Sequence, residues 1–163
     1  MDTEVLMDLC SKNIPLNQLH GIHINHNLTD QANEYEDLVV HRCIEKKISL
    51  IVKSEKRNDT KGESMEMWGR RVRYRNYFKT LNRINFDYIL TAHHADDNIE
   101  TILMNIDRGC SPRGLRGIIP KNGKIVRPML VYKKSDVIKY AKNNNINYVY
   151  DLSNNDTAIS AII

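Results

Sequence analysis

The fold of this chain is decided by one stretch, YILTAHHADDNIETILMNIDRG at residues 88–109. The stretch begins inside a short apolar run, residues 86–92, whose length and bulk are those of a buried strand. The apolar residues after it recur at the i, i+3, i+4 and i+7 positions of one helix face: Ile99, Ile102, Leu103 and Ile106. The order of strand, polar turn and helix predicts an open α/β sheet, in which ligands bind at the carboxyl ends of strands.

The polar turn of this stretch holds five ionisable side chains within eight residues: His93, His94, Asp96, Asp97 and Glu100. We expect Asp97 to cap the helix, with Glu100 completing a capping box and Gly109 ending the helix. Two carboxylates beside two imidazoles exceed what capping requires. The cluster therefore indicates a site that binds a divalent metal, a ribose or an amine; the alternative is a strand end capped by polar residues.

The composition is that of an ordinary globular protein, with 41% hydrophobic and 27% charged residues in 163 positions. This length predicts one domain, residues 1–163. A net charge of +4 favours an anionic partner only mildly. No apolar run approaches the roughly 18 residues of a membrane helix, and no signal peptide opens the chain. The three cysteines lack C-x-x-C pairing, which indicates reduced thiols in a cytoplasmic protein without a zinc or iron–sulfur site.

Outside the central stretch, helical and strand patterns alternate along the chain. Helices are expected at residues 3–10, 30–47, 60–81 and 134–143, and strands at residues 19–25, 49–53, 125–131 and 148–156. Asp30 is the expected cap of the second helix, and Thr60 with Glu63 that of the third. Pro128 indicates that its strand lies at a sheet edge or ends there. The alternation predicts a doubly wound parallel sheet, with no strand before Thr3, where such a fold usually begins.

The third expected helix carries four arginines within six residues: Arg70, Arg71, Arg73 and Arg75. They form two adjacent basic rows, because one pair is spaced i, i+3 and the other i, i+4. Like charges so close repel, which favours a bound anion that offsets them. Tyr74 and Tyr77 could stack on a base, and Met65 and Met67 are expected to fill the core. The alternative is a solvated helix face.

A glycine-rich basic loop follows the central helix at residues 109–117. Arg108, Arg113 and Arg116 lie in or beside it, and its glycines allow close approach of the backbone to phosphate or nucleic acid. The alternative is a basic surface turn. His23 and His26 end the strand at residues 19–25, on the side where the site is expected, although a lone histidine there is more often structural.

Several of these segments together resemble the tRNA(Ile)-lysidine synthetases, a family of PP-loop ATP pyrophosphatases. The most specific segment is LTAHHADDNIETIL at residues 90–103, which is followed by RG at 108–109 and by GLRGI at 114–118. The other similar segments are INHNL at 24–28, EMWGRRVRY at 66–74, VRPML at 126–130 and YDLSNND at 150–156. The resemblance covers essentially the whole chain. It implies an adenine nucleotide alpha hydrolase-like fold whose first strand and phosphate loop are truncated, with Asp2 as the remaining loop aspartate.

The resemblance also implies a reaction. ATP adenylates the C2 oxygen of the wobble cytidine in a tRNA(Ile) with a CAU anticodon, and the ε-amine of L-lysine then displaces AMP to form lysidine. The resemblance further implies that Mg²⁺ binds together with ATP and that the protein does not act at a membrane. A homodimer is a possible assembly. The implied site residues are Asp97, Asp96, Arg70 and Glu100 for catalysis, Asp2, Thr3, His26, His93, Arg108 and Gly109 for ATP, and Asp2 and Asp97 for the metal.

Three other functions are left open by the sequence. A PP-loop tRNA thiolase keeps the fold but commonly carries cysteine pairs, which this chain lacks. A metal-dependent phosphohydrolase explains the cluster at residues 93–97 but neither the arginine helix nor the glycine-rich loop. An inactive RNA-binding fragment is the third alternative, and it predicts no ATP binding.

Overall fold

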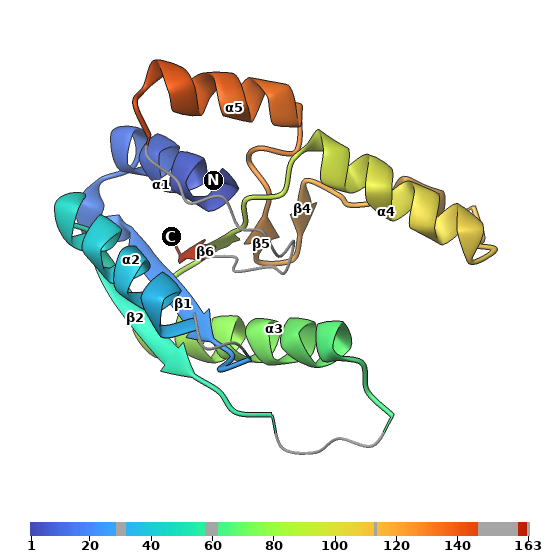
Figure 1. Cartoon of the computed structure of the whole chain (residues 1–163), viewed down its shortest axis with the longest axis horizontal. Coiled ribbons are helices and arrows are strands. Elements are labelled where there is room, and N and C mark those ends of the chain that lie inside the picture. Colours follow the sequence, from blue (N-terminus) through green and yellow to red (C-terminus); the bar gives the residue numbers. More distant parts are fainter. Residues whose placement is uncertain (29–31, 58–61, 113, 147–159, 163) are drawn as a thin grey trace.

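The computed structural model describes residues 1–28, 32–57, 62–112, 114–146 and 160–162, the last of these by backbone alone (Figure 1). Within these residues the helices are α1 (Asp2–Asn13), α2 (Ala32–Glu45), α3 (Met65–Ile84), α4 (Ala95–Asp107) and α5 (Lys134–Asn143). The strands are β1 (His20–Asn25), β2 (Ser49–Ser54), β3 (Ile89–Leu90), β4 (Lys121–Asn122), β5 (Ile125–Val126) and β6 (Ser160–Ile162). The alternation of helix and strand that the sequence predicts is therefore confirmed.

The strands form one sheet in the order β2-β1-β6-β3-β5-β4. β1 pairs with β2, and β3 with β5, in parallel as predicted. Two short strands run against this direction: β6 is antiparallel to its neighbours β1 and β3, and β4 is antiparallel to β5. The strand expected at residues 148–156 lies outside the described residues.

Helices cover both faces of this sheet, which confirms the doubly wound α/β architecture (Figure 1). One buried cluster joins α1, α2 and α5 to one face, and a second joins α3 to the other. Successive side chains of a strand point to opposite faces of the sheet, and β3 shows this: Ile89 belongs to the α3 cluster and Leu90 to the cluster on the other face. Tyr77 is completely buried in the α3 cluster, so the expectation that it stacks on a base is wrong.

The arrangement of β1 and β3 creates a switch point in the sheet. Both strands run antiparallel to β6, so they are parallel to each other and their carboxyl ends lie at the same edge. The chain proceeds from β1 outward to β2 on one side, and from β3 outward to β5 on the other. Such a reversal is where ligands bind in open α/β sheets.

Several element boundaries differ from the sequence expectations. α3 begins at Met65 because the Ser64 hydroxyl accepts a hydrogen bond from the Met67 N–H, so the expected capping box from Thr60 is wrong; Thr60 itself, like Asp30, lies outside the described residues. β3 and β5 are only two residues long, shorter than the apolar runs that predicted them. β5 is also not an edge strand, although it ends just before Pro128 as expected.

The apolar face of α4 is the largest departure from the expected core. Ile99, Leu103 and Ile106 share a face as predicted, yet each is more than half exposed. Figure 1 shows α4 extending away from the sheet. Met65 and Met67, expected as core filler, are also exposed. Periodicity establishes which residues share a helix face, but the tertiary arrangement decides whether that face is covered.

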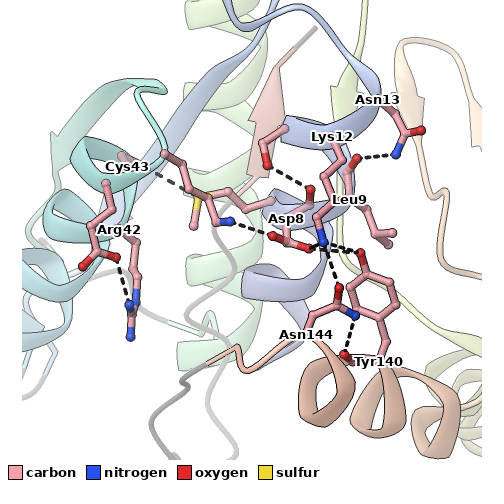
Figure 2. Close-up of polar contacts among 12 residues, drawn as sticks. Asp8, Leu9, Lys12, Asn13, Arg42, Cys43, Tyr140 and Asn144 are labelled. Atoms are coloured by element: carbon pink, nitrogen blue, oxygen red, sulfur yellow. Dashed lines mark hydrogen bonds and ion pairs between the residues drawn. The ribbon is translucent and has the colours of Figure 1, made fainter.

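A buried carboxylate joins the helices on one face of the sheet (Figure 2). Asp8 of α1 accepts hydrogen bonds from Lys12 Nζ at 2.7 Å, from Lys46 Nζ at 2.7 Å and from the Tyr140 hydroxyl at 3.0 Å. Lys46 follows α2 and Tyr140 lies on α5. Burial alone would raise the pKa of Asp8, but these hydrogen bonds outweigh it and hold the pKa below its ordinary value. The network therefore favours the ionised carboxylate.

Candidate active site

The polar turn after β3 is organised by His94, which caps α4. The Asp97 N–H donates to His94 Nδ1 at 3.4 Å, and the His94 N–H donates to Asp97 Oδ2 at 2.7 Å. This reciprocal pair is a capping box in which His94 is the N-cap and Asp97 is the third helical residue. The expectation that Asp97 caps the helix with Glu100 is therefore wrong, and Glu100 is exposed one turn further along. Gly109, with φ +70°, follows the end of the helix as expected.

Three helix N-termini meet at this turn. Asp2 lies in the first turn of α1, Asp96 in that of α4, and Lys134 is the first residue of α5. Lys134 Nζ donates to both carboxylate oxygens of Asp2 at 2.6 Å, and the Lys134 N–H donates to Asp96 Oδ2 at 2.6 Å. His94 Nε2 lies 3.8 Å from Asp2 Oδ2. The structure thus brings Asp2, Asp96 and Asp97 together, as the sequence predicts.

The environment of Asp97 disfavours its charge. Partial burial raises the pKa of Asp97 and the nearby Asp2 carboxylate adds to the rise, while the hydrogen bond from the His94 N–H opposes it. The net effect is a pKa above the ordinary value for aspartate. A carboxylate held in this way interacts more strongly with a cation that enters the site than a fully solvated one does.

The described side chains do not by themselves form a metal site. In the ranges that the structure covers, no group of three or more histidine, cysteine, aspartate or glutamate side chains is arranged to hold a metal ion. Of the two carboxylates expected to bind Mg²⁺, Asp2 has both oxygens on Lys134 and Asp97 is engaged with His94. The cation paired with Asp2 is therefore an ammonium group of the chain.

Histidines of β1 and of the turn after β3 occupy the same sheet edge. His93 follows β3, and its Nδ1 lies 2.9 Å from the Thr91 hydroxyl. His26 follows β1 and contacts the edge of Trp68, with ring centroids 5.4 Å apart. The two strands are about 10 Å apart, because β6 lies between them. His26 and His93 thus lie on opposite sides of the switch point.

His23 and His26 are neutral in this structure's environment. Burial, followed by the charge of Arg73, lowers the pKa of His26 to about 4, and burial also lowers the pKa of His23. Both nitrogens of His23 and Nδ1 of His26 are buried without a hydrogen-bond partner among the described residues. The hydrogen-bonding capacity of these buried nitrogens is therefore unused among the described residues.

The arginine helix divides into two rows with different partners. Arg71 pairs with Glu63 at 2.7 Å, and Arg75 pairs with Glu55 at 2.9 Å, so a bound anion is not needed to offset that row. In the other row, the guanidinium of Arg70 lies 5.1 Å from the centre of the Tyr74 ring. Arg70 belongs to α3, which packs on the face of the sheet opposite α1 and α5.

Arg108 and Gly109 lie far from the carboxylates. Arg108 follows Asp97 by eleven positions along α4, which corresponds to about 17 Å along the helix axis. The glycine-rich loop folds back onto this helix: the Ile118 N–H donates to Asn98 Oδ1 at 2.6 Å, and Asn105 Nδ2 donates to the Gly114 carbonyl at 2.9 Å. Arg113 lies outside the described residues. Gly114 and Gly117 therefore lie close to residues of α4, whereas a Cβ at Gly109 would meet nothing within 4 Å.

Substitution of Gly117 tests this contact. A Cβ at Gly117 would overlap Asn98 Oδ1 and lie 2.7 Å from Ile102 Cγ1, at a φ of +58°. Gly123 has the same φ but open space around it. We expect Gly117→Ala to lower the free energy of unfolding by about 1–3 kcal/mol more than Gly123→Ala, measured by urea denaturation. Equal losses would mean that the left-handed backbone alone accounts for both glycines.

The structural roles of two site residues, His94 and Lys134, are not predicted by the sequence patterns. The sequence places His94 in the ligand-binding cluster and not at the cap, although a histidine before an Ala-Asp-Asp turn can accept from the helix N–H groups. It indicates Lys134 only as a possible first residue of a helix. Its one local signal is a cation at the first helical position, where the helix dipole favours an anion.

Helices on both faces of a sheet, a switch point between β1 and β3, and helix N-termini at that edge define the class of open α/β domains that bind nucleotides. A family model described as the PP-loop domain matches residues 1–161. The chain belongs to the PP-loop domain family.

The chain is similar to several proteins named tRNA(Ile)-lysidine synthase. It is 36% identical to the one from Petrotoga mobilis over 81% of this chain and 43% of that protein. It is 32% identical to the one from Vibrio parahaemolyticus over 96% of this chain and 37% of that protein. It is 34% identical to one from Francisella tularensis over 96% of this chain and 39% of that protein. The chain thus spans about two fifths of the length of these relatives.

Among solved structures, the chain is similar to the U34-tRNA thiolase NcsA from Methanococcus maripaludis with its [4Fe-4S] cluster. The TM-score is 0.74 at 18% identity, and the match covers 94% of this chain and 57% of the thiolase chain. At this identity the similarity supports the fold. In the part of the chain that the structure describes, no helix has the length and hydrophobicity needed to cross a membrane.

Proposed function

We propose that this chain is the ATP-using domain of a tRNA(Ile)-lysidine synthase and acts in the cytoplasm. The observation that carries the proposal is the meeting of Asp2, Asp96 and Asp97 at helix N-termini beside the switch point. It occurs in a chain that matches relatives of that name over most of its length. In the proposed reaction, ATP adenylates the C2 oxygen of the wobble cytidine, pyrophosphate leaves, and L-lysine displaces AMP.

The two kinds of group at the site suit the two charged substrates. Free N–H groups at the start of α1, where Asp2 and Thr3 lie, suit the phosphates of ATP, and Mg²⁺ would arrive with those phosphates. The carboxylates of Asp96, Asp97 and Glu100 suit the ammonium group of L-lysine. Removing a proton from that group produces the amine that attacks C2.

The remaining predicted residues approach from other elements. His26 and His93 would bind the nucleoside part of ATP across the switch point, where His26 has a free nitrogen. Arg70 would bind the phosphates or the adenylated base from α3. Arg108 and Gly109, at the far end of α4, suit the tRNA backbone better than ATP, since helix length separates them from Asp97. A homodimer stays a prediction.

The alternative functions gain no specific support. For sulfur transfer, burial raises the pKa of the Cys10 and Cys43 thiols to about 11, and the partly exposed Cys110 has no cysteine beside it in the sequence with which to form a C-x-x-C pair. Hydrolysis at a metal needs a set of ligands, which the described residues do not form. An RNA-binding fragment without ATP chemistry is separated from the proposal by direct measurement.

Two measurements on this chain test the proposal. Calorimetry with ATP and Mg²⁺ is expected to show saturable binding in the micromolar range. Incubation with ATP, labelled L-lysine and a tRNA(Ile) transcript with a CAU anticodon is expected to transfer the label to the tRNA. The matched control is the same transcript with uridine at the wobble position, which offers no cytidine C2 and is expected to stay unlabelled. Labelling of both transcripts, or ATP binding without labelling of either, would contradict the proposal.

A further inference from the structure

Lys134 is the cation of the candidate active site. Its ammonium group contacts both carboxylate oxygens of Asp2 at 2.6 Å, although the two residues are 132 positions apart in the sequence. The charge of Lys134 also lowers the pKa of Asp97, against the stronger opposing effect of burial. One side chain of α5 thus compensates carboxylates that the first turns of α1 and α4 contribute.

The position of this ammonium is unfavourable for the helices alone. A helix N-terminus carries a partial positive charge, so a cation beside it costs about 0.3–1 kcal/mol unless an anion offsets it. Lys134 lies at the N-terminus of its own helix and reaches the N-terminus of α1. The Asp2 carboxylate is the anion in direct contact with the ammonium, and Asp96 and Asp136 add negative charge at the start of α5. The same place would be strongly favourable for a polyanion, which would contact the ammonium and the helix N–H groups together.

The pairing with Asp2 is weak enough to be exchanged. The side chains of Lys134 and Asp2 are 37% and 30% exposed, and ion pairs with such access to water contribute about 0–1 kcal/mol. The backbone of Lys134 is fixed, because its N–H donates to Asp96 Oδ2 at 2.6 Å. The flexible four-carbon side chain can therefore change its partner while the helix stays in place.

We propose that Lys134 is an exchangeable counter-cation: it neutralises Asp2 in the nucleotide-free chain and transfers its ammonium to the phosphates of a bound nucleoside triphosphate. The transfer frees the Asp2 carboxylate at the moment when the phosphates arrive. The inference rests on the proposed function for the identity of the anion. The pairing with Asp2 in the free chain stands independently of it.

The exchange predicts opposite effects of one substitution on two ligands. Lys134→Met keeps the length of the side chain and removes its charge. Binding of Mn²⁺ without nucleotide, measured by electron paramagnetic resonance, is expected to be weak in the parent chain and to tighten about tenfold in Lys134→Met, because the Asp2 carboxylate then no longer has its internal cation. Binding of α,β-methylene-ATP with Mg²⁺, measured by calorimetry, is expected to weaken about tenfold. Lys134→Arg keeps the charge and is expected to leave both affinities within about threefold of the parent chain.

Lys133→Met is the matched control, since Lys133 is the neighbouring exposed lysine and, within the described portion of the chain, no hydrogen bond or ion pair joins it to Asp2. It is expected to change neither affinity. If Lys134→Met leaves Mn²⁺ binding unchanged, or weakens both ligands together, the exchange is wrong. A parent chain that binds no nucleotide would overturn the proposed function and the phosphate half of the inference, while the manganese measurement would still decide the pairing with Asp2. Thermal unfolding of each variant confirms that it is folded.

Discussion

Replacing Asp97 with asparagine is expected to reduce the transfer of labelled L-lysine to tRNA(Ile) at least 100-fold, as estimated for loss of a charged group that acts in the reaction. The reason is electrostatic. Asp97 lies partly buried beside Asp2 and His94, where a carboxylate interacts strongly with the ammonium group of lysine. An asparagine in its place offers an amide oxygen of similar shape without the charge. The measurement is the initial rate of label transfer at saturating ATP.

The Asp97→Asn substitution separates the charge of Asp97 from its structural role in the cap of α4. Asp97 Oδ2 accepts the His94 N–H in the capping box, and an asparagine Oδ1 can accept it too. The variant is therefore expected to unfold within a few degrees of the parent chain. Asp107→Asn, at the exposed end of α4, is the matched control and is expected to retain full transfer. Transfer by Asp97→Asn at more than one tenth of the parent rate would contradict the assignment of Asp97.

The features that could be predicted from the sequence are those with local causes. The helix at residues 95–107 follows from its apolar spacing, and Gly109 ends it through its left-handed backbone. The meeting of Asp96 and Asp97 with Asp2 was predicted from the resemblance to a family. Its geometric reason is that first turns of helices in an open α/β sheet collect at the carboxyl edge.

The features that could not be predicted depend on contacts distant in the sequence. Nothing near Lys134 indicates that its ammonium pairs with Asp2 across 132 positions. The antiparallel β6 between β1 and β3 likewise has no local signature in three residues. The cap of α4 is a different case, since the sequence allows either His94 or Asp97 as the N-cap. The extended backbone of His94, at φ −119° and ψ 179°, and its reciprocal hydrogen bonds with Asp97 identify His94.

Replacement of Asp8 with asparagine is expected to lower the free energy of unfolding by about 2–4 kcal/mol at pH 7. Asp8 is buried, and its carboxylate holds α1 to Lys46 beyond α2 and to Tyr140 on α5 (Figure 2). The amide carries no charge, so the Lys46 ammonium, whose side chain is 26% exposed, would lose the carboxylate that lies 2.7 Å from it. Urea denaturation measures the loss. Asp37→Asn, an exposed carboxylate of α2, is the matched control and is expected to change stability by less than about 0.5 kcal/mol.

Acid titration then shows whether charge or shape causes the loss. Because hydrogen bonds hold the pKa of Asp8 below its ordinary value in the folded chain, its contribution to stability is complete above the unfolded pKa of about 3.9. That contribution is lost as the pH falls through the folded pKa, when the parent chain also becomes neutral at this position. The difference between the parent chain and Asp8→Asn should therefore be constant from pH 7 to about pH 5 and shrink below about pH 4. A difference that persists unchanged into that acid range would assign the loss to packing and not to the charge of Asp8.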